Sequence, residues 1–265
     1  MTRVVSGGVL LLIAVGAVWF SPSWLFLIIA ELLLVIGCWE LSTLARHSRL
    51  QMPAAASTVA AALVCASFSE ALPGGQRLPL DVVLLTALVA LAALSLVSWR
   101  GGDDALGSAA AALLPSLYLG LPLGAMVATR EAGGPRALFL LMLTVVVSDS
   151  AQYYTGRALG RRPLAERVSP KKTMEGAAGG LVIGSAFLAA LGAWWLPSVP
   201  LPLRALLGIT IVALGIVGDL FESMLKRSAG VKDSSSLIPG HGGVLDRIDA
   251  LLFAAPIYYV VLRYV

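Results

Sequence analysis

Acidic side chains at the ends of two apolar runs are the groups in this sequence best placed to do chemistry. Asp149 ends one run, and Asp219 and Glu222 end another. A carboxylate at a membrane boundary is costly unless it faces the protein interior, so such residues are functional hypotheses by default. The alternative is a carboxylate that only pairs with a basic residue one turn away. On a helix, the spacing i, i+3, i+4 and i+7 places four polar side chains on one face: Asp219, Glu222, Ser223 and Lys226.

A second acidic pair stands further along the chain. Asp246 and Asp249 occupy positions i and i+3, with Arg247 between them. If the two acidic faces meet at the membrane surface, they form a site of hard oxygen ligands. Such a site suits Mg²⁺, which takes one or two carboxylates together with substrate phosphates. We expect Asp219 and Asp246 to hold Mg²⁺, alone or with a second cation, while Asp249 and Glu222 complete or orient the metal shell. Purely structural ion pairs are the alternative.

Two polar loops carry basic residues and glycines that suit phosphate groups. The loop that follows Lys226 contains a Gly-His-Gly-Gly turn at 240–243, where side chains and bare backbone N–H groups can approach a polyphosphate together. The other loop ends at 169–176 with Lys171 and Lys172 and leads into a helix, whose first N–H groups can bind an anion. A plain turn whose lysines only follow membrane orientation is the alternative.

The composition requires most of this 265-residue chain to lie in lipid. Hydrophobic residues make up 58% and charged residues only 13%, about half the charge of an ordinary soluble domain. Only helices and closed barrels satisfy every backbone polar group in lipid, and these apolar runs are too long for barrel strands. The sequence therefore predicts an all-α, polytopic transmembrane bundle of about nine helices. The expected spans are about 4–20, 23–44, 54–71, 80–99, 106–128, 137–154, 176–196, 203–224 and 250–264.

The distribution of Lys and Arg predicts the orientation and the division of labour. Most of the 19 basic residues fall on the side of the N-terminus and the even-numbered loops, which should face the cytoplasm. We expect residues 1–136 to be a scaffold of helices that contacts lipid and a second copy, and residues 137–265 to carry the catalytic loops. The two form one membrane unit. The first run is expected to remain as a helix, because eight further apolar runs follow it.

Several functions are excluded by what the sequence lacks. It contains no Gly-Lys dipeptide, hence no Walker A loop, and no GxGxxG dinucleotide fingerprint. GxSxG and HExxH are also missing. The net charge of +4 does not indicate nucleic-acid binding, because the basic residues gather in loops between apolar runs. Cys38 and Cys65 stand inside apolar runs and are expected to be buried small hydrophobes.

The run from residue 223 to residue 249 closely resembles the signature of the phosphatidate cytidylyltransferases, the CDP-diacylglycerol synthases. That signature reads S-x-x-K-R-x4-K-D, a short polar spacer, then H-G-G-x-x-D-R-x-D. Residues 148–150, Tyr153, 156–157 and 169–173 also resemble the family. Gln152 and Met174 depart from its usual pattern, which concerns local packing and nucleotide fit. Each fixed position of the signature has a counterpart here: Ser223, Lys226, Arg227, Lys232, Asp233, His241, Gly242, Gly243, Asp246, Arg247 and Asp249.

The resemblance implies an Mg²⁺-dependent reaction of CTP with phosphatidate that gives CDP-diacylglycerol and pyrophosphate. It also implies a helical membrane protein, usually a homodimer, in the bacterial cytoplasmic (inner) membrane with its active site facing the cytoplasm. His241 would position the pyrophosphate or deliver a proton to it. The expected catalytic residues are Asp219, Asp246, Asp249, Lys226, Arg227 and His241. The expected substrate- and nucleotide-binding residues are Asp149, Ser169, Lys171, Lys172, Glu175, Ser223, Lys232, Asp233, Gly242, Gly243 and Arg247. The expected metal ligands are Asp219, Asp246, Glu222 and Asp249.

Three rival functions remain open at this point. A CTP-dependent polyprenol or other lipid kinase would transfer the γ-phosphoryl group, so the cytidylyl group would never enter lipid. A CDP-archaeol synthase would perform the same chemistry on an ether lipid. A secondary transporter would place its ionisable residues in the middle of its spans, whereas Asp149, Asp219 and Glu222 stand at span ends.

Overall fold

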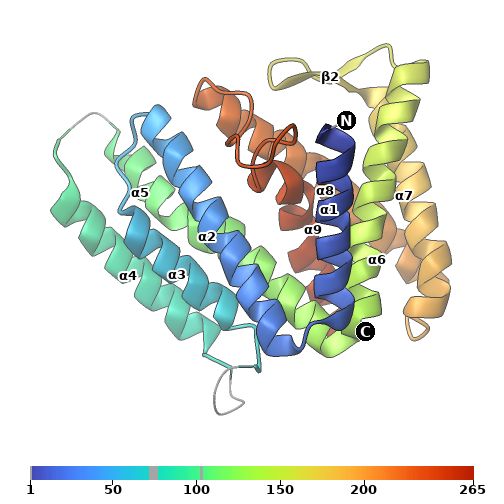
Figure 1. The fold of residues 1–265 in the computed structure, drawn as a ribbon, viewed down its shortest axis with the longest axis horizontal. Helices are drawn as coiled ribbons and strands as arrows, with labels where there is room; N and C mark the ends of the chain where they lie inside the picture. Colours follow the sequence, from blue (N-terminus) through green and yellow to red (C-terminus); the bar gives the residue numbers. More distant parts are fainter. Residues whose placement is uncertain (1, 72–76, 102–103) are drawn as a thin grey trace. The chain divides into compact units, whose positions relative to one another are not determined.

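The computed structural model describes residues 2–71, 77–101 and 104–265 (Figure 1). Helices dominate these residues, which confirms the all-α prediction, and the sequence does not predict the one small sheet. The elements are, in chain order, α1 (Thr2–Phe20), α2 (Ser23–His47), α3 (Ala54–Ala66), α4 (Leu80–Ser98), α5 (Ala105–Pro115), the π-helical turn η1 (Ser116–Gly120), α6 (Leu121–Leu159), β1 (Pro163–Ala165), β2 (Ser169–Thr173), α7 (Met174–Trp195), α8 (Leu201–Ser228) and α9 (Leu245–Tyr264).

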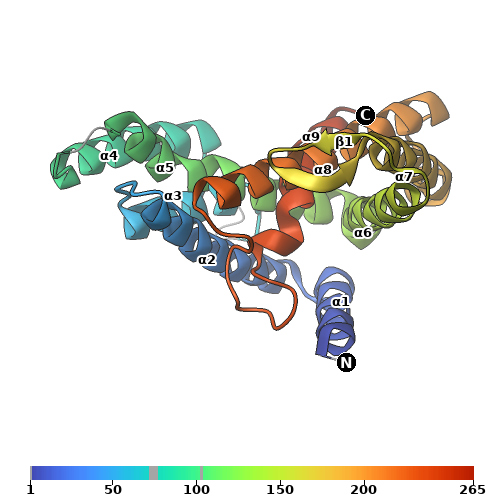
Figure 2. The ribbon, with the colours of Figure 1, turned by 90° about the horizontal axis from the view of Figure 1, so that it is seen from above.

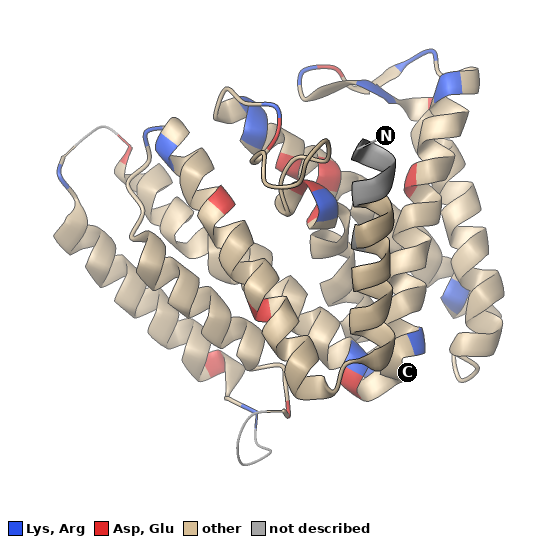
Figure 3. Ribbon diagram, viewed as in Figure 1, with Lys and Arg blue, Asp and Glu red and all other residues tan. Residues whose placement is uncertain are grey.

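Five helical stretches of the described chain are long and apolar enough to cross a membrane. They are Ser23–His47, Leu80–Ser98, Ala105–Leu159, Met174–Trp195 and Leu201–Ser228. Figure 3 shows that α3 and α4 carry almost no charged side chains. Large apolar side chains lie exposed on α4, such as Val97 with 84% of its surface accessible. Such surfaces suit lipid rather than water, so the protein is an integral membrane protein.

The helices of the described chain differ from the predicted spans in two places. The run predicted at 54–71 becomes the 13-residue α3, which at about 1.5 Å per residue is shorter than about 30 Å of hydrocarbon. The runs predicted at 106–128 and 137–154 join into one helical stretch, Ala105–Leu159. Within it, Gly134 has a φ of 74°, where α6 bends ahead of Pro135. The count of nine spans therefore stays a prediction.

The chain folds as two compact units. Unit 1 contains Met1–Glu131 and Leu225–Arg247, and unit 2 contains Ala132–Met224 and Ile248–Val265. The signature segment therefore contributes most of its residues to unit 1, while the acids that end the preceding apolar runs belong to unit 2.

In unit 1, the core lies where α2, α3 and η1 pack together. Leu34, Val64 and Leu119 are fully buried there. Gly120 allows the close approach, because a Cβ atom at that position would lie 2.7 Å from the carbonyl oxygen of Ala61. This close packing holds α2 in place, and α2 positions Glu40 against the signature segment.

In unit 2, small residues let α6 and α7 pack closely. A Cβ atom at Gly180 would lie 2.3 Å from Cγ of Gln152, and one at Gly184 would lie 2.9 Å from Cβ of Ser148. Gly180 and Gly184, four residues apart on α7, therefore form a helix-packing face. The hairpin of β1 and β2 contacts α7, as Figures 1 and 2 show.

Candidate active site

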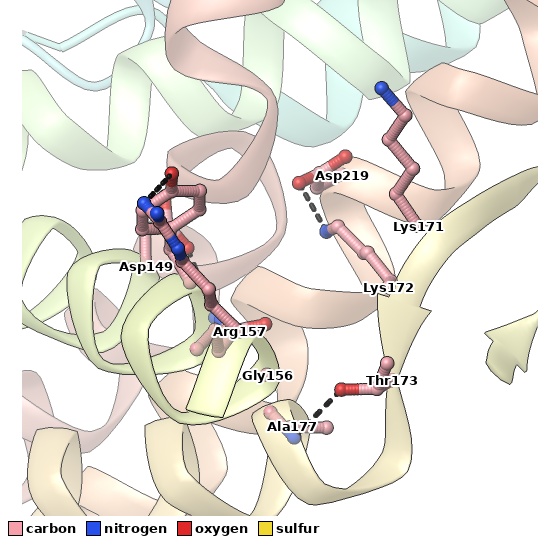
Figure 4. A pocket seen from close by; sticks show the side chains of 11 residues that line it. Asp149, Gly156, Arg157, Lys171, Lys172, Thr173, Ala177 and Asp219 are labelled. Carbon is pink, nitrogen blue, oxygen red and sulfur yellow. Dashed lines mark hydrogen bonds and ion pairs between the residues drawn. The ribbon is translucent and has the colours of Figure 1, made fainter. Parts of the chain in front are cut away.

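A pocket of about 420 Å³ in unit 2 gathers several of the residues that the sequence singles out. Four elements supply its walls: α6, β2, α7 and α8. Figure 4 shows Lys172 turned toward Asp219 in this pocket. The lining residues are Asp149, Gln152, Tyr153, Gly156, Arg157, Lys171, Lys172, Thr173, Gly176, Ala177 and Asp219.

Asp219 is the acidic centre of this pocket. Its carboxylate forms an ion pair with Lys172 and accepts a 3.4 Å hydrogen bond from the Ser223 hydroxyl. The Lys172 and Asp219 side chains remain 23% and 29% exposed, so solvent or a ligand can reach both. In Figure 4, Lys171 extends away from this pair. The second lysine therefore provides a positive charge that Asp219 does not engage.

On the α6 wall, Gln152 holds the Asp149 carboxylate. The Gln152 amide donates hydrogen bonds to Oδ1 of Asp149 at 3.1 Å and to the Ser148 hydroxyl at 3.2 Å. Gln152, the departure from the family pattern, thus packs against Gly180 and orients an acid at the same time.

The β-hairpin places the two lysines at the mouth of the pocket. Its strands pair antiparallel, with Ala165 opposite Ser169. The hydroxyl of Thr173 then caps α7 by accepting a 3.1 Å hydrogen bond from the N–H of Gly176. Glu175, expected to bind substrate, accepts hydrogen bonds from the N–H groups of Arg161 and Arg162 at 3.0 and 3.2 Å. Its carboxylate therefore anchors the start of the hairpin.

Three carboxylates of unit 2 lie within electrostatic reach of one another. Burial, the negative charge of Asp219 and, more weakly, that of Asp149 raise the pKa of Asp249 to about 7, from an ordinary value near 4. α8 and α9 touch here, because a Cβ atom at Gly218 would lie 2.5 Å from the Asp249 carbonyl oxygen. Neighbouring negative charges of this kind favour a bound cation, and oxygen ligands suit Mg²⁺. The residues present therefore fit this metal.

No preformed cage of protein ligands surrounds such an ion in the described part of the chain. Among residues 2–71, 77–101 and 104–265, no group of three or more His, Cys, Asp or Glu side chains is arranged to hold a metal. This arrangement is compatible with Mg²⁺, which commonly takes one or two carboxylates and completes its shell with water and substrate phosphates. Glu222, expected to help orient the metal, is completely buried on α8.

In unit 1, the signature segment folds around Asp246. One carboxylate oxygen pairs with Lys226, and the other accepts hydrogen bonds from the N–H and hydroxyl of Ser234, at 2.9 and 2.7 Å, and from the N–H of Gly243 at 2.8 Å. The Lys226 and Asp246 side chains are only 10% and 5% exposed. Burial alone would raise the pKa of Asp246, but these hydrogen bonds outweigh it and lower the pKa. Asp246 therefore carries its charge at neutral pH.

Two glycines of the Gly-His-Gly-Gly turn belong to the signature, and each position requires glycine for a different structural reason. Gly242 has a φ of 79°, a left-handed conformation that favours glycine, and a Cβ atom there would lie 2.6 Å from Oδ2 of Asp246. At Gly243, a Cβ atom would lie 2.2 Å from a carboxylate oxygen of Glu40.

Glu40 is the residue of this region that sequence reasoning missed. It lies on α2, is completely buried and accepts hydrogen bonds from the signature segment. An acid inside an apolar run is the same signal that drew attention to Asp149. The signal was present in Cys-Trp-Glu-Leu at 38–41.

The remaining signature residues lie around this core. Arg227 donates a 3.0 Å hydrogen bond to the carbonyl oxygen of Val231. Lys232, Asp233 and Arg247 are exposed. His241 lies in the turn that the Ile238–Gly242 bridge closes, and Ser169 is half-buried in β2.

These features define an integral membrane protein with an acidic and basic pocket suited to phosphate groups and a divalent cation. A sequence model of the cytidylyltransferase family matches residues 1–265. The phosphatidate cytidylyltransferase of Pseudomonas aeruginosa is 38% identical over 98% of this chain and 96% of its own length. Those of Thermotoga maritima and Helicobacter pylori are 38% and 36% identical over 70% of this chain, and the matches cover 69% and 66% of their lengths. The chain belongs to the cytidylyltransferase family.

Proposed function

We propose that this protein transfers the cytidylyl group of CTP to phosphatidate, giving CDP-diacylglycerol and pyrophosphate in phospholipid biosynthesis. Its family membership and the names of its relatives support this reaction. The observation that carries the proposal is the pocket of unit 2, where Lys172 of β2 pairs with Asp219 of the apolar helix α8, beside Lys171 of β2 and Asp149 of α6. Lysines suit the phosphates of both substrates, and the surrounding helices suit the acyl chains.

The reaction is an in-line displacement at the α-phosphorus of CTP. A phosphate oxygen of phosphatidate forms the new P–O bond, and the bond to the β-phosphate breaks, so that the electron pair leaves with pyrophosphate. The attacking oxygen is already anionic, so no strong general base is required. The difficulty is electrostatic, because two anions must meet while charge develops on the leaving group.

The basic side chains address this difficulty directly. Lys171 is placed to contact a phosphate, and Lys172 can exchange its Asp219 partner for a phosphate oxygen. We assign neutralisation of the remaining phosphate charge to four basic side chains of the signature: Lys226, Arg227, Lys232 and Arg247. His241 would position the pyrophosphate or protonate it, while Ser169, Ser223 and Asp233 would complete the polar wall around the substrates.

We assign Mg²⁺, alone or with a second cation, to Asp219 and Asp246, with Asp249 and Glu222 completing or orienting the shell. Burial and the negative charge of Asp219 raise the pKa of Asp249, and this concentration of acids supports a cation beside Asp219. When bound, the ion would neutralise phosphate oxygens and stabilise the leaving group. Asp246 already carries its charge in the structure, held by Lys226 and by the loop N–H groups.

We also propose how the protein lies in the cell. The apolar runs of the sequence would make about nine crossings of the bacterial inner membrane, with the active site open to the cytoplasm. The positive-inside distribution of Lys and Arg supports this orientation. Residues 1–136 would form the scaffold and a homodimer contact, and residues 137–265 would carry most of the catalytic groups.

The test is a double-label assay with purified protein, phosphatidate vesicles and Mg²⁺. We expect label at the α-phosphate of CTP to enter the organic phase and label at the γ-phosphate to remain in water as pyrophosphate. Label from the γ-phosphate in lipid would instead show a lipid kinase, and no label in lipid from either position would refute both. An ether-linked phosphatidate run in parallel separates a CDP-archaeol synthase.

A further inference from the structure

Glu40 connects α2 to a segment almost 200 residues further along the chain. Its carboxylate accepts four hydrogen bonds, all from the signature segment of unit 1. One oxygen accepts from the Ser235 hydroxyl at 2.7 Å and the N–H of Val244 at 2.9 Å. The other accepts from the N–H of Leu245 at 2.8 Å and the Ser234 hydroxyl at 3.1 Å. Four donors around one carboxylate satisfy its oxygens in a fully buried place.

The two backbone donors are the free N–H groups at the start of α9, which begins at Leu245. A helix leaves its first N–H groups without internal partners, and an acid usually satisfies them from the preceding residues. Here Glu40 supplies the cap from another helix. The position and direction of the first turn of α9, which carries Asp246, are therefore fixed by α2.

Glu40 is also linked to Asp246 through Ser234. The Ser234 hydroxyl lies 3.1 Å from Glu40 and 2.7 Å from Asp246, although its single proton can be donated to one carboxylate at a time. Gly243 leaves room for this arrangement, since a Cβ atom there would lie 2.1 Å from the Ser234 hydroxyl and 2.2 Å from Glu40. Gly243 of the signature is thus needed because a residue outside the signature, Glu40, approaches it closely.

We propose that Glu40 is a positioning residue for cytidylyl transfer. Glu40 contacts the signature segment and holds Ser234, Gly243 and the start of α9 in place. The Asp246–Lys226 pair therefore keeps the geometry that the reaction requires. The inference rests on the proposed function, because it concerns the same reaction. Through Glu40, the N-terminal helix α2 contributes directly to the organisation of the site.

The main variant is Glu40→Gln, and Glu31→Gln is its matched control on the same helix. Gln keeps the shape of Glu but presents an NH₂ group to donors, so at least one loop N–H loses its acceptor. Hydrogen bonds to a charged group are strong enough for a loss of kcat of at least about tenfold. We expect Glu31→Gln to stay within about twofold of the wild-type kcat, because Glu31 lies more than two helical turns before Glu40 on α2, roughly 13 Å away along the helix axis.

Amide hydrogen exchange distinguishes positioning from general weakening of the fold. In Glu40→Gln, exchange should accelerate at 234–246 while α3 and α7 keep wild-type protection. Faster exchange throughout the protein, or an unchanged kcat, would contradict the proposal. If the wild-type protein itself transfers no α-label to lipid, the proposed function fails instead.

A milder pair of variants keeps the test decisive if Glu40→Gln does not fold. Ser235→Ala removes one donor to Glu40, whereas Ser236→Ala changes the exposed neighbour. We expect Ser235→Ala to lower kcat by about threefold or more and Ser236→Ala to leave it unchanged. Equal rates in these two variants would overturn the proposal.

Discussion

Asp246 and Asp219 are both acids paired with a lysine, yet their surroundings are opposite. Asp246 is almost fully buried, accepts hydrogen bonds from the N–H groups of Ser234 and Gly243, and has a lowered pKa. Asp219 is about a third exposed, lies on a pocket wall and adds to the negative charge that raises the pKa of Asp249. The comparison teaches that the protein itself holds the charge of Asp246 in place, whereas Asp219 and its neighbours leave more of their charge open to a ligand.

Removal of either acid should cause the largest loss of activity. We expect Asp219→Ala and Asp246→Ala each to reduce turnover at least ~100-fold, as loss of an electrostatic contact to reacting phosphates requires. The assay is transfer of α-label from CTP to lipid by protein that inserts and purifies normally. Near-normal turnover in both variants would exclude the proposed metal site.

The stability of these two variants should differ. Asp246→Ala leaves Lys226 buried without this partner, which costs about 3–5 kcal/mol. Asp219→Ala frees a partly exposed Lys172, and such a pair contributes about 0–1 kcal/mol. Thermal unfolding in detergent should therefore show a clear decrease for Asp246→Ala alone. Equal unfolding temperatures would remove the distinction between the two regions.

Lys172→Gln should separate chemistry from stability within the pocket. We expect a loss of turnover of about tenfold or more, because a phosphate loses its cation, with unfolding changed by less than about 1 kcal/mol. Steady-state kinetics with varied CTP and a melting curve measure the two quantities. A stable variant with wild-type kcat/KM for CTP would show that Lys172 serves Asp219 only.

Glu175→Gln should have a smaller effect. Its carboxylate accepts from two backbone N–H groups that start the hairpin, so the amide would hold Lys171 and Lys172 less firmly. We expect kcat/KM for CTP to fall by about three- to tenfold. A loss as large as that of Asp219→Ala would instead indicate direct contact of Glu175 with substrate.

Arg49→Ala is the control and should have the smallest effect. Arg49 is exposed just after α2, away from the residues around Asp219 and Asp246. Its φ of 61° is equally unfavourable for alanine and for arginine, so the substitution adds no backbone strain. We expect activity within about twofold of wild type and no more than about 0.5 kcal/mol change in stability. A large loss of activity would mean that positive charge on the cytoplasmic side in general, rather than the residues around Asp219 and Asp246, supports activity.

Much of this molecule could be predicted from its sequence, because apolar runs specify helices in lipid. Several residues of the pocket could also be predicted from the sequence, because Asp149, Lys172 and Asp219 flank such runs. The β-hairpin was missed because its strands are three and five residues long and rich in charge. Glu40 was missed for another reason: its donors, two backbone N–H groups and two serine hydroxyls, lie 194 to 205 residues further along the chain, so no local spacing connects it to the signature.

The most direct test of the proposed metal site at Asp219 is the equilibrium binding of Mn²⁺ to purified protein in the presence of CTP. Mn²⁺ is a spectroscopic substitute for Mg²⁺. Electron paramagnetic resonance counts the free ion. We expect saturable binding by the wild-type protein and by Arg49→Ala, and at least about tenfold weaker binding by Asp219→Asn. Equal binding by all three proteins would contradict the claim that Asp219 holds the divalent ion.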